Sequence, residues 1–116
     1  MITVINFSHP LSDQALAKLA EILGTQPDDV VVYHLPIYME MGSLMERYIN
    51  AIISETVLLA GNNPLNVDCF IPPNDGRAAI VMGAIMAREW HYLPNLVMMD
   101  PHGSVPVALV RGGTIS

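Results

Sequence analysis

The sequence has a single cysteine and few basic residues, and both shortages limit what the protein can be. Because Cys69 stands alone, no intramolecular disulfide can form, and no cysteine–histidine spacing of the zinc type accompanies it, so a reducing cytoplasm is the expected compartment. The net charge of −6 with only five cations argues against duplex nucleic acid as a partner, because such binding needs a basic stripe. A small anion remains an acceptable ligand, because helix N-termini and backbone N–H groups hold phosphate without many lysines. The five cations are Lys18, Arg47, Arg77, Arg88 and Arg111.

Long apolar runs are also missing. No basic segment followed by an apolar stretch opens the chain, and the apolar stretch from Tyr48 to Ala60 is interrupted by Asn50, Ser54 and Glu55. We therefore expect neither a secretory leader nor a membrane-spanning helix.

Apolar residues as such are abundant. A chain of 116 residues has the length of one domain, here 1–116, that buries roughly two thirds of its unfolded surface. Hydrophobic residues make up 52% of it, whereas charged residues make up 14%, against roughly 25% in ordinary domains. Eight methionines suit irregular core gaps and adaptable interfaces equally. We expect part of the apolar surface to meet a second copy of the chain, in a homodimer or a larger assembly.

Five short apolar runs bounded by proline, glycine and asparagine predict strands. The second run is continuously apolar as far as Tyr33, which is typical of a strand covered on both faces. The connection between the last two runs is too short for a crossover helix, so this pair should be antiparallel. The predicted strands cover residues 2–7, 30–35, 67–71, 95–99 and 105–110.

Three segments with helical periodicity separate the first four strands. The first runs from its N-cap Ser12 to its stop signal Gly24, and the second from the capping box Ser43–Glu46 to Gly61. The third covers 77–90, and its small residues should let it pack tightly against the sheet or a partner helix. This alternation predicts a small Rossmann-like, three-layer α/β fold, with a mostly parallel sheet and an antiparallel last strand.

In such a sheet, ligands bind where the turns after the strands converge, here at 6–10, 34–38, 72–77 and 100–103. In the first turn, Ser8 and His9 precede a helix whose positive dipole end favours an anion. Ser8 would donate to a phosphate, and His9 would donate to it or relay a proton. The alternative is that Asn6 and Ser8 only satisfy the turn backbone and that His9 packs against a neighbour. The turn has neither G-x-G-x-x-G nor P-loop spacing, which disfavours a dinucleotide or a nucleoside triphosphate.

The third turn offers Asn74 or Asp75 as the N-cap of the last helix. Arg77 in that helix's first turn opposes the dipole unless an anion or a carboxylate compensates it, so it is the best cationic candidate. His91 and His102 have structural or solvated roles in this interpretation, and the histidines lack the paired carboxylates of a metal site, so no metal or cofactor is expected. Ser8 and His9 are the catalytic candidates. The candidate ligand-binding residues are Asn6, Phe7, Ser8, His9, His34, Pro73, Asn74, Asp75, Gly76 and Arg77.

Three segments resemble a known family. The opening Val4–Leu11, the Pro72–Pro73 turn followed by Ala78–Ile80, and the approach Trp90–Pro94 are similar to small CRISPR-associated accessory proteins of the Csx class, found with type III systems. The resemblance implies a CARF-like dimer that binds a cyclic oligoadenylate messenger of antiviral defence. Cyclic tetra-adenylate is the first choice, because its two-fold ring fits an isologous dimer.

The resemblance leaves three functions open. The first is sequestration of the messenger, which would lower antiviral signalling. The second is a metal-independent ring nuclease, in which a ribose 2′-OH attacks its own phosphorus while Ser8, His9 and Arg77 align it and stabilise the charge. The third is a protein-interaction subunit without a nucleotide ligand. Binding is common to the first two, and we take it as the expected function.

Overall fold

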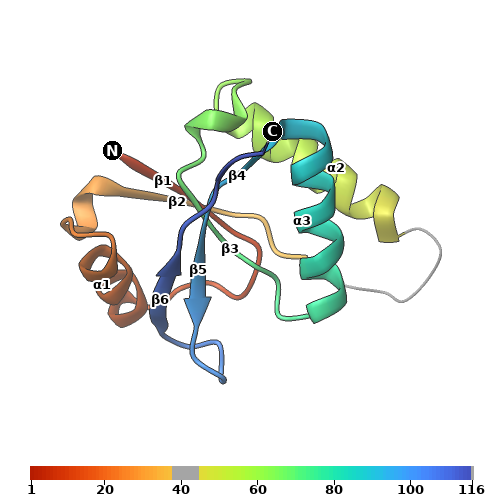
Figure 1. Ribbon diagram of the computed structural model, residues 1–116. Helices are drawn as coiled ribbons and strands as arrows, with labels where there is room; N and C mark the ends of the chain where they lie inside the picture. The colour runs from red at the N-terminus through yellow and green to blue at the C-terminus, as the bar shows by residue number, and fades with distance from the viewer. Residues whose placement is uncertain (38–44, 116) are drawn as a thin grey trace.

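The computed structural model describes residues 1–37 and 45–115 and contains a five-stranded, mostly parallel sheet (Figure 1). The strands lie in the order β2-β1-β3-β5-β6, and only β6 runs antiparallel to its neighbour. The predicted α/β class, the mostly parallel sheet and the antiparallel last strand are confirmed. The strands are β1 (Ile2–Asn6), β2 (Val30–His34), β3 (Cys69–Ile71), β5 (Asn95–Met99) and β6 (Pro106–Val110).

The strand order makes the sheet doubly wound. β1 pairs with β2 on one side, Ile2 opposite Val30, and with β3 on the other, Val4 opposite Cys69. The chain therefore runs from β1 to β2 at one edge of the sheet, and later returns to form β3 on the other side of β1. Right-handed crossovers then place the first helix on one face and the later helices on the other. This reversal between β1 and β3 is where open α/β sheets bind ligands.

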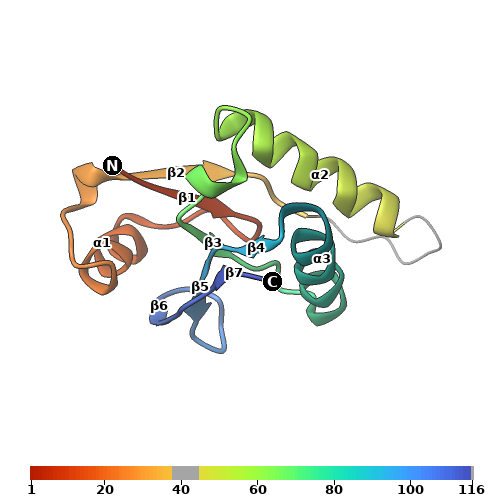
Figure 2. The ribbon, with the colours of Figure 1, turned by 45° about the horizontal axis from the view of Figure 1, so that its top comes forward.

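The helix α1 (Asp13–Ile22) covers one face of the sheet (Figure 2). Its N-cap is Ser12, whose Oγ accepts from the Ala15 N–H at 3.1 Å, and Gly24 follows its end with a φ of 71°. Both predicted helix boundaries are confirmed. The cluster beneath α1 is fully buried and consists of Val4, Leu19, Cys69, Ile71 and Val97.

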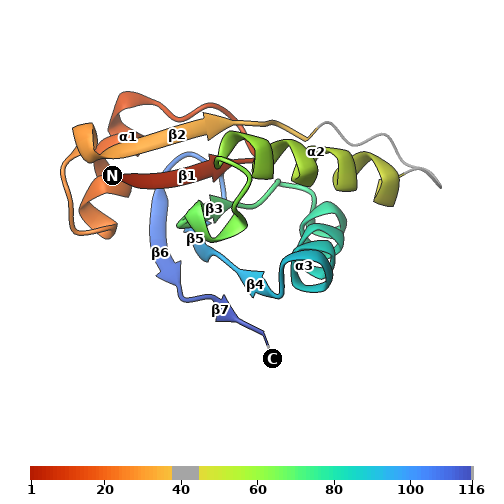
Figure 3. The same cartoon turned by 90° about the horizontal axis from the view of Figure 1, so that it is seen from above.

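The helices α2 (Met45–Leu59) and α3 (Gly76–Trp90) cover the opposite face (Figure 3). Ser43 of the predicted capping box lies outside the described residues. Glu46, the other member of that box, accepts instead from Arg88 Nη1 at 3.1 Å and so ties α2 to α3. The main core lies between these helices and the sheet. It includes Ile5, Phe7, Ile49, Ile53, Phe70, Met82, Ile85 and Met86.

The small residues of α3 only partly pack as predicted. Ala78 is buried in the core, but Ala79 and Gly83 line an apolar groove of about 430 Å³ between α3 and the β5–β6 pair. Nothing lies within 4 Å of a Cβ built on Gly83. Tight packing against the sheet is therefore wrong along this side of α3, because its bulkier residues carry the helix onto the core. Packing against a partner helix stays a prediction.

Two short strands, β4 (Tyr92–Leu93) and β7 (Gly113–Thr114), form a separate antiparallel pair that the sequence patterns did not indicate. Gly112 allows it, since a Cβ there would lie 1.9 Å from the Leu93 carbonyl oxygen. Two 3₁₀ turns, Pro27–Asp29 and Pro64–Asn66, precede β2 and β3. Because of the second turn, β3 begins at Cys69 and not at residue 67 as predicted.

The strand β2 lies at the edge of the sheet. Val30 and Val32 pack towards α1 and Tyr33 towards α2 and α3, so both faces are covered, as predicted. The edge position leaves these residues only half-buried.

The expectation about membrane spans concerns the helices. None of those in the described parts of the chain has the length and hydropathy that a membrane span requires.

Candidate functional site

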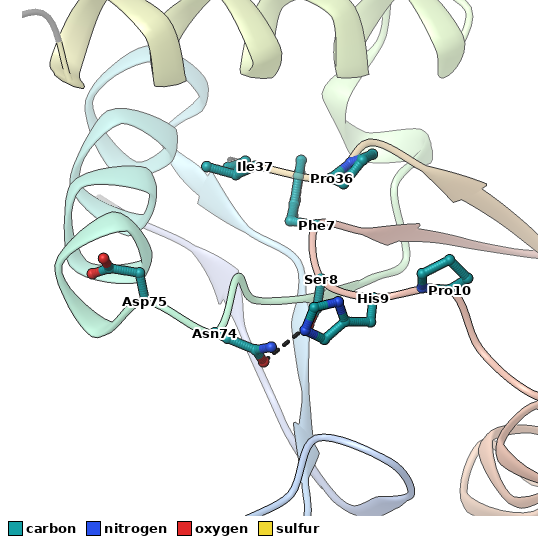
Figure 4. Close-up of a pocket in the computed structure, with 8 residues that line it drawn as sticks. All are labelled: Phe7, Ser8, His9, Pro10, Pro36, Ile37, Asn74 and Asp75. Atoms are coloured by element: carbon teal, nitrogen blue, oxygen red, sulfur yellow. Dashed lines mark hydrogen bonds between the residues drawn. The ribbon is translucent and has the colours of Figure 1, made fainter. Parts of the chain in front are cut away.

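A hollow of about 350 Å³ opens at the carboxyl ends of β1 and β3, where the strand order reverses (Figure 4). We call it the switch-point hollow. Its volume lies at the lower end of the range of about 300 to 1,000 Å³ that is usual for small-molecule sites. It brings together the first and third predicted turns and the segment that follows β2. Its lining residues are Phe7, Ser8, His9, Pro10, Pro36, Ile37, Asn74 and Asp75.

Asn6 shapes the first turn. Its Oδ1 accepts from the Ser8 N–H at 2.9 Å, and its Nδ2 donates to the His9 carbonyl at 2.7 Å. The side chain is 1% exposed and does not line the hollow. For Asn6, the alternative that it satisfies the turn backbone therefore describes the geometry. Phe7, also 1% exposed, contributes mainly to the core, where its ring meets Phe70 edge-on at 6.3 Å.

Ser8 connects the first and third turns. Its hydroxyl donates to Asn74 Oδ1 at 2.9 Å, across 66 positions of sequence. This bond uses the amide oxygen of Asn74, which is exposed, and leaves its Nδ2 without a hydrogen-bond partner in the described parts of the chain. An amide nitrogen offers two N–H donors. Asn74 therefore presents donors to a ligand from the centre of this edge.

His34 holds the end of β2 against the first turn. Its Nε2 lies 2.7 Å from the Ser8 carbonyl oxygen, which can only accept, so this nitrogen carries the hydrogen. The chain then continues alongside β1: the Leu35 N–H donates to the Asn6 carbonyl at 2.9 Å and the Ile37 N–H to the Phe7 carbonyl at 3.2 Å. These bonds place Pro36 and Ile37 in the hollow, whereas His34 does not line it. Residue 38 of the predicted turn lies outside the described residues.

His9 is exposed at the rim of the hollow. No hydrogen bond joins its ring to another side chain in residues 1–37 and 45–115. A histidine that acts as a general base is usually oriented by a carboxylate or a carbonyl on its second nitrogen. The described residues give His9 no such group, and its ring is available to contact a ligand.

Asp75 is the N-cap of α3, which confirms one of the two predicted alternatives. Its Oδ1 accepts from the Arg77 N–H at 2.9 Å and the Ala78 N–H at 3.4 Å. The Arg77 guanidinium returns to the same carboxylate, with Nη2 at 3.0 Å from Oδ2 and Nε at 3.3 Å from Oδ1. This side-chain hydrogen bond is the main reason why the pKa of Asp75 lies below its ordinary value.

The Asp75–Arg77 pair supplies the carboxylate that Arg77 needs to offset the helix dipole. Arg77 does not line the hollow, and the N-terminus of α3 is filled by its own cap. Gly76 begins α3 and is exposed, whereas Pro73 is buried and belongs to the neighbouring hollow. The structure therefore gathers Phe7, Ser8, His9, Asn74 and Asp75 at one site and leaves the other five candidates beside it.

The site has little positive charge. Lys18 pairs with Glu21 at 3.5 Å, and Arg88 pairs with Glu46 and Glu89. No lysine or arginine lines the switch-point hollow. A phosphate bound here would be held by neutral donors and histidine, which suits a compact ligand better than a polyanion.

Cys69 is not a candidate nucleophile. It lies in β3, is 1% exposed, and burial, helped by the charge of Asp68, raises the pKa of its thiol to about 11. The reactive thiolate is therefore negligible at neutral pH. The described residues also contain no group of three His, Cys, Asp or Glu side chains that could hold a metal ion.

A second hollow of about 480 Å³ lies beside the first, at the carboxyl ends of β3 and β5, and shares Asn74 with it. The sequence indicated its outer turn, 100–103, but not the methionines of β5 that line it.

No family model matches this sequence, and comparisons with curated proteins and with solved structures find no significant match. The resemblance of the opening segment therefore stays a prediction.

Proposed function

We propose that this chain binds a cyclic oligoadenylate, cyclic tetra-adenylate in the first instance, and lowers type III CRISPR antiviral signalling by sequestering it. One observation carries the proposal. The segment Val4–Leu11, on which the family resemblance mainly depends, forms the end of β1 and one wall of the switch-point hollow. The residues that resemble a nucleotide-binding family thus lie where a doubly wound sheet binds ligands.

The chemistry of the hollow supports a nucleotide ligand. Pro36 and Ile37 provide apolar walls that suit a base, and Ser8 and Asn74 provide neutral polar groups for ribose and phosphate. The net charge of −6 and the carboxylate of Asp75 disfavour long polyanions. A closed ring of a few nucleotides carries few charges and is compatible with this balance.

A homodimer is part of the proposal. A hollow of about 350 Å³ is too small to enclose a ring of four nucleotides. Two chains related by a two-fold axis would present each turn twice to a ring of matching symmetry. The cytoplasm, where the messenger would be made, is the corresponding compartment.

Binding is favoured over ring cleavage because of the surroundings of His9. In the part of the chain that the structure describes, no carboxylate orients its ring, and the charge of Arg77 is compensated by Asp75. Cleavage would need alignment of a ribose hydroxyl and stabilisation of charge on the phosphorane. The residues gathered here supply donors for binding but no tuned base.

The test is incubation of the pure protein with cyclic tri-, tetra- and hexa-adenylate, with gel shift to detect binding and chromatography to detect products. The proposal predicts a shift at one ring per two chains and intact ligand after long incubation. Linear products in molar excess over protein, unaffected by chelator, would establish a ring nuclease instead. The absence of binding with all three rings would contradict the proposal and favour a protein-interaction subunit.

A further inference from the structure

The second hollow is lined in part by apolar side chains. Its apolar lining residues are Pro72, Pro73, Met98, Met99 and Pro101, of which Met98 is exposed. Thioether sulfur makes favourable contacts with aromatic rings. A hollow of about 480 Å³ with such walls suits a planar heterocyclic base.

The outer wall of this hollow is held in place before any ligand arrives. Asp100 Oδ1 accepts from the Ser104 N–H at 2.7 Å and the Val105 N–H at 3.1 Å, and its Oδ2 accepts from Ser104 Oγ at 3.0 Å. The Gly103 N–H donates to the Asp100 carbonyl at 2.9 Å, with Gly103 at a φ of 69°. A preorganised wall reduces the conformational entropy that is lost when the ligand binds.

Asn74 lies between the two hollows and lines both. Its Oδ1 is held by Ser8, and the 100–104 turn approaches it so closely that a Cβ on Gly103 would lie 3.4 Å from Oδ1. Its Nδ2 has no partner among the described residues. An oriented amide with free donors thus separates two hollows that are each suited to a nucleoside.

We propose that the carboxyl edge of each chain holds two successive nucleosides of one ligand, one in each hollow, with Asn74 Nδ2 donating to the phosphodiester between them. This inference rests on the proposed function and deepens it. The recognised unit is a linked dinucleotide, and His102 at the far side of the second hollow contacts only the second nucleoside. Two chains then offer four nucleoside positions, which matches a ring of four.

The experiment is titration calorimetry of the full chain with adenylyl-(3′→5′)-adenosine, adenosine monophosphate and cyclic tetra-adenylate. We expect the Kd of the dinucleotide to be at least about tenfold lower than that of the mononucleotide. A tenfold difference in Kd corresponds to about 1.4 kcal/mol of binding free energy. The variant His102→Trp, which places a larger side chain at the second hollow, should abolish this preference and weaken binding of the ring about tenfold, while the mononucleotide still binds in the switch-point hollow.

A matched control replaces a histidine at the other end of α3. His91→Asn keeps a residue that tolerates the left-handed conformation found there, φ 52°, and should leave all three affinities unchanged. Melting temperatures establish that each variant folds. If the ring binds and His102→Trp retains full affinity for ring and dinucleotide, this inference alone is overturned. If none of the three ligands binds to the wild-type chain, the proposed function and this inference both fail.

Discussion

The two ends of the sheet both pair polar side chains with backbone groups, but they differ in the polar groups that they leave exposed. At the amino end, polar side chains are paired with backbone: Asp68 Oδ2 accepts from the Thr3 N–H at 2.8 Å, and Asn95 Oδ1 accepts from the Gly112 N–H at 2.9 Å. At the carboxyl end, His9 and the Nδ2 of Asn74 are exposed and have no partner in the described residues. The Nδ2 of Asn95 at the amino end likewise has no partner in the described residues, but Asn95 lines neither the switch-point hollow nor the second hollow. An unused donor beside one of these hollows therefore distinguishes the candidate site from the structural end better than residue type does.

The largest expected effect is at the structural end. Gly112→Ala should lower the free energy of unfolding by about 2 to 3 kcal/mol, because its Cβ would lie 1.9 Å from a backbone oxygen of Leu93 that cannot move alone. Urea denaturation measures the loss. Gly83→Ala is the control, since nothing lies within 4 Å of its Cβ, and it should be neutral or stabilising by up to roughly 1 kcal/mol. Equal losses for the two variants would show that the close approach at Gly112 does not exist.

Asn74→Asp should weaken binding of cyclic tetra-adenylate about 30-fold, which corresponds to about 2 kcal/mol for lost donors and added negative charge. The oxygen that accepts from Ser8 is kept, so the melting temperature should hardly change. Asn95→Asp makes the same substitution at the amino end, likewise keeps its acceptor, and should bind normally. Calorimetry compares the two. If Asn74→Asp and Asn95→Asp bind cyclic tetra-adenylate with the same Kd, the contrast between the two ends of the sheet has no bearing on binding.

Ser8→Ala should have a smaller effect, about three- to fivefold weaker binding, because the loss of one exposed hydrogen bond frees Asn74 to rotate. Ser54→Ala removes a hydroxyl from α2 that lines neither hollow and should bind like the wild type. A direct titration with labelled ring compares them. Unchanged binding in Ser8→Ala would mean that Asn74 needs no support from the first turn.

Lowering the pH should destabilise the turn at residues 100–104, which forms the outer wall of the second hollow. The backbone N–H groups of Val105 and Ser104 hold the pKa of Asp100 below its ordinary value of 3.8. Its contribution to stability is therefore complete above about pH 4 and is lost as the pH falls through the lower, folded-state pKa. Asp100→Asn should show a smaller fall in melting temperature between pH 5 and pH 2.5 than the wild type. Asp28→Asn, whose carboxylate makes no hydrogen bond in the described residues, should keep the wild-type slope.

Local features of the fold were predictable from the sequence. The cap at Ser12 and the stop at Gly24 depend on contacts within a few residues, which composition and spacing report directly, whereas the cap of α3 was narrowed only to Asn74 or Asp75. The small residues of α3 misled the prediction, because a small side chain permits close packing without requiring it. The pair β4–β7 was missed because each strand has only two residues.

The candidate site was predictable as a set of turns but not as a geometry. Ser8 and Asn74 were both candidates, yet nothing in the sequence indicated that they bond to each other. The sequence required an anion or a carboxylate near Arg77 but did not say which, because its pairing with Asp75 depends on side-chain conformations that spacing does not reveal. Pro36 and Met98 carry no polar signal that would have identified them as lining residues.

The alternation of strands and helices, the antiparallel last pair and the shortage of basic residues could be read from the sequence, because these follow from local periodicity, connection length and composition. The tertiary structure alone decided the strand order, which brings the ends of β1 and β3 together, and the division of polar groups into satisfied and unused donors. Those features depend on how the whole chain buries its apolar surface and on bonds such as Ser8–Asn74, which join residues 66 positions apart.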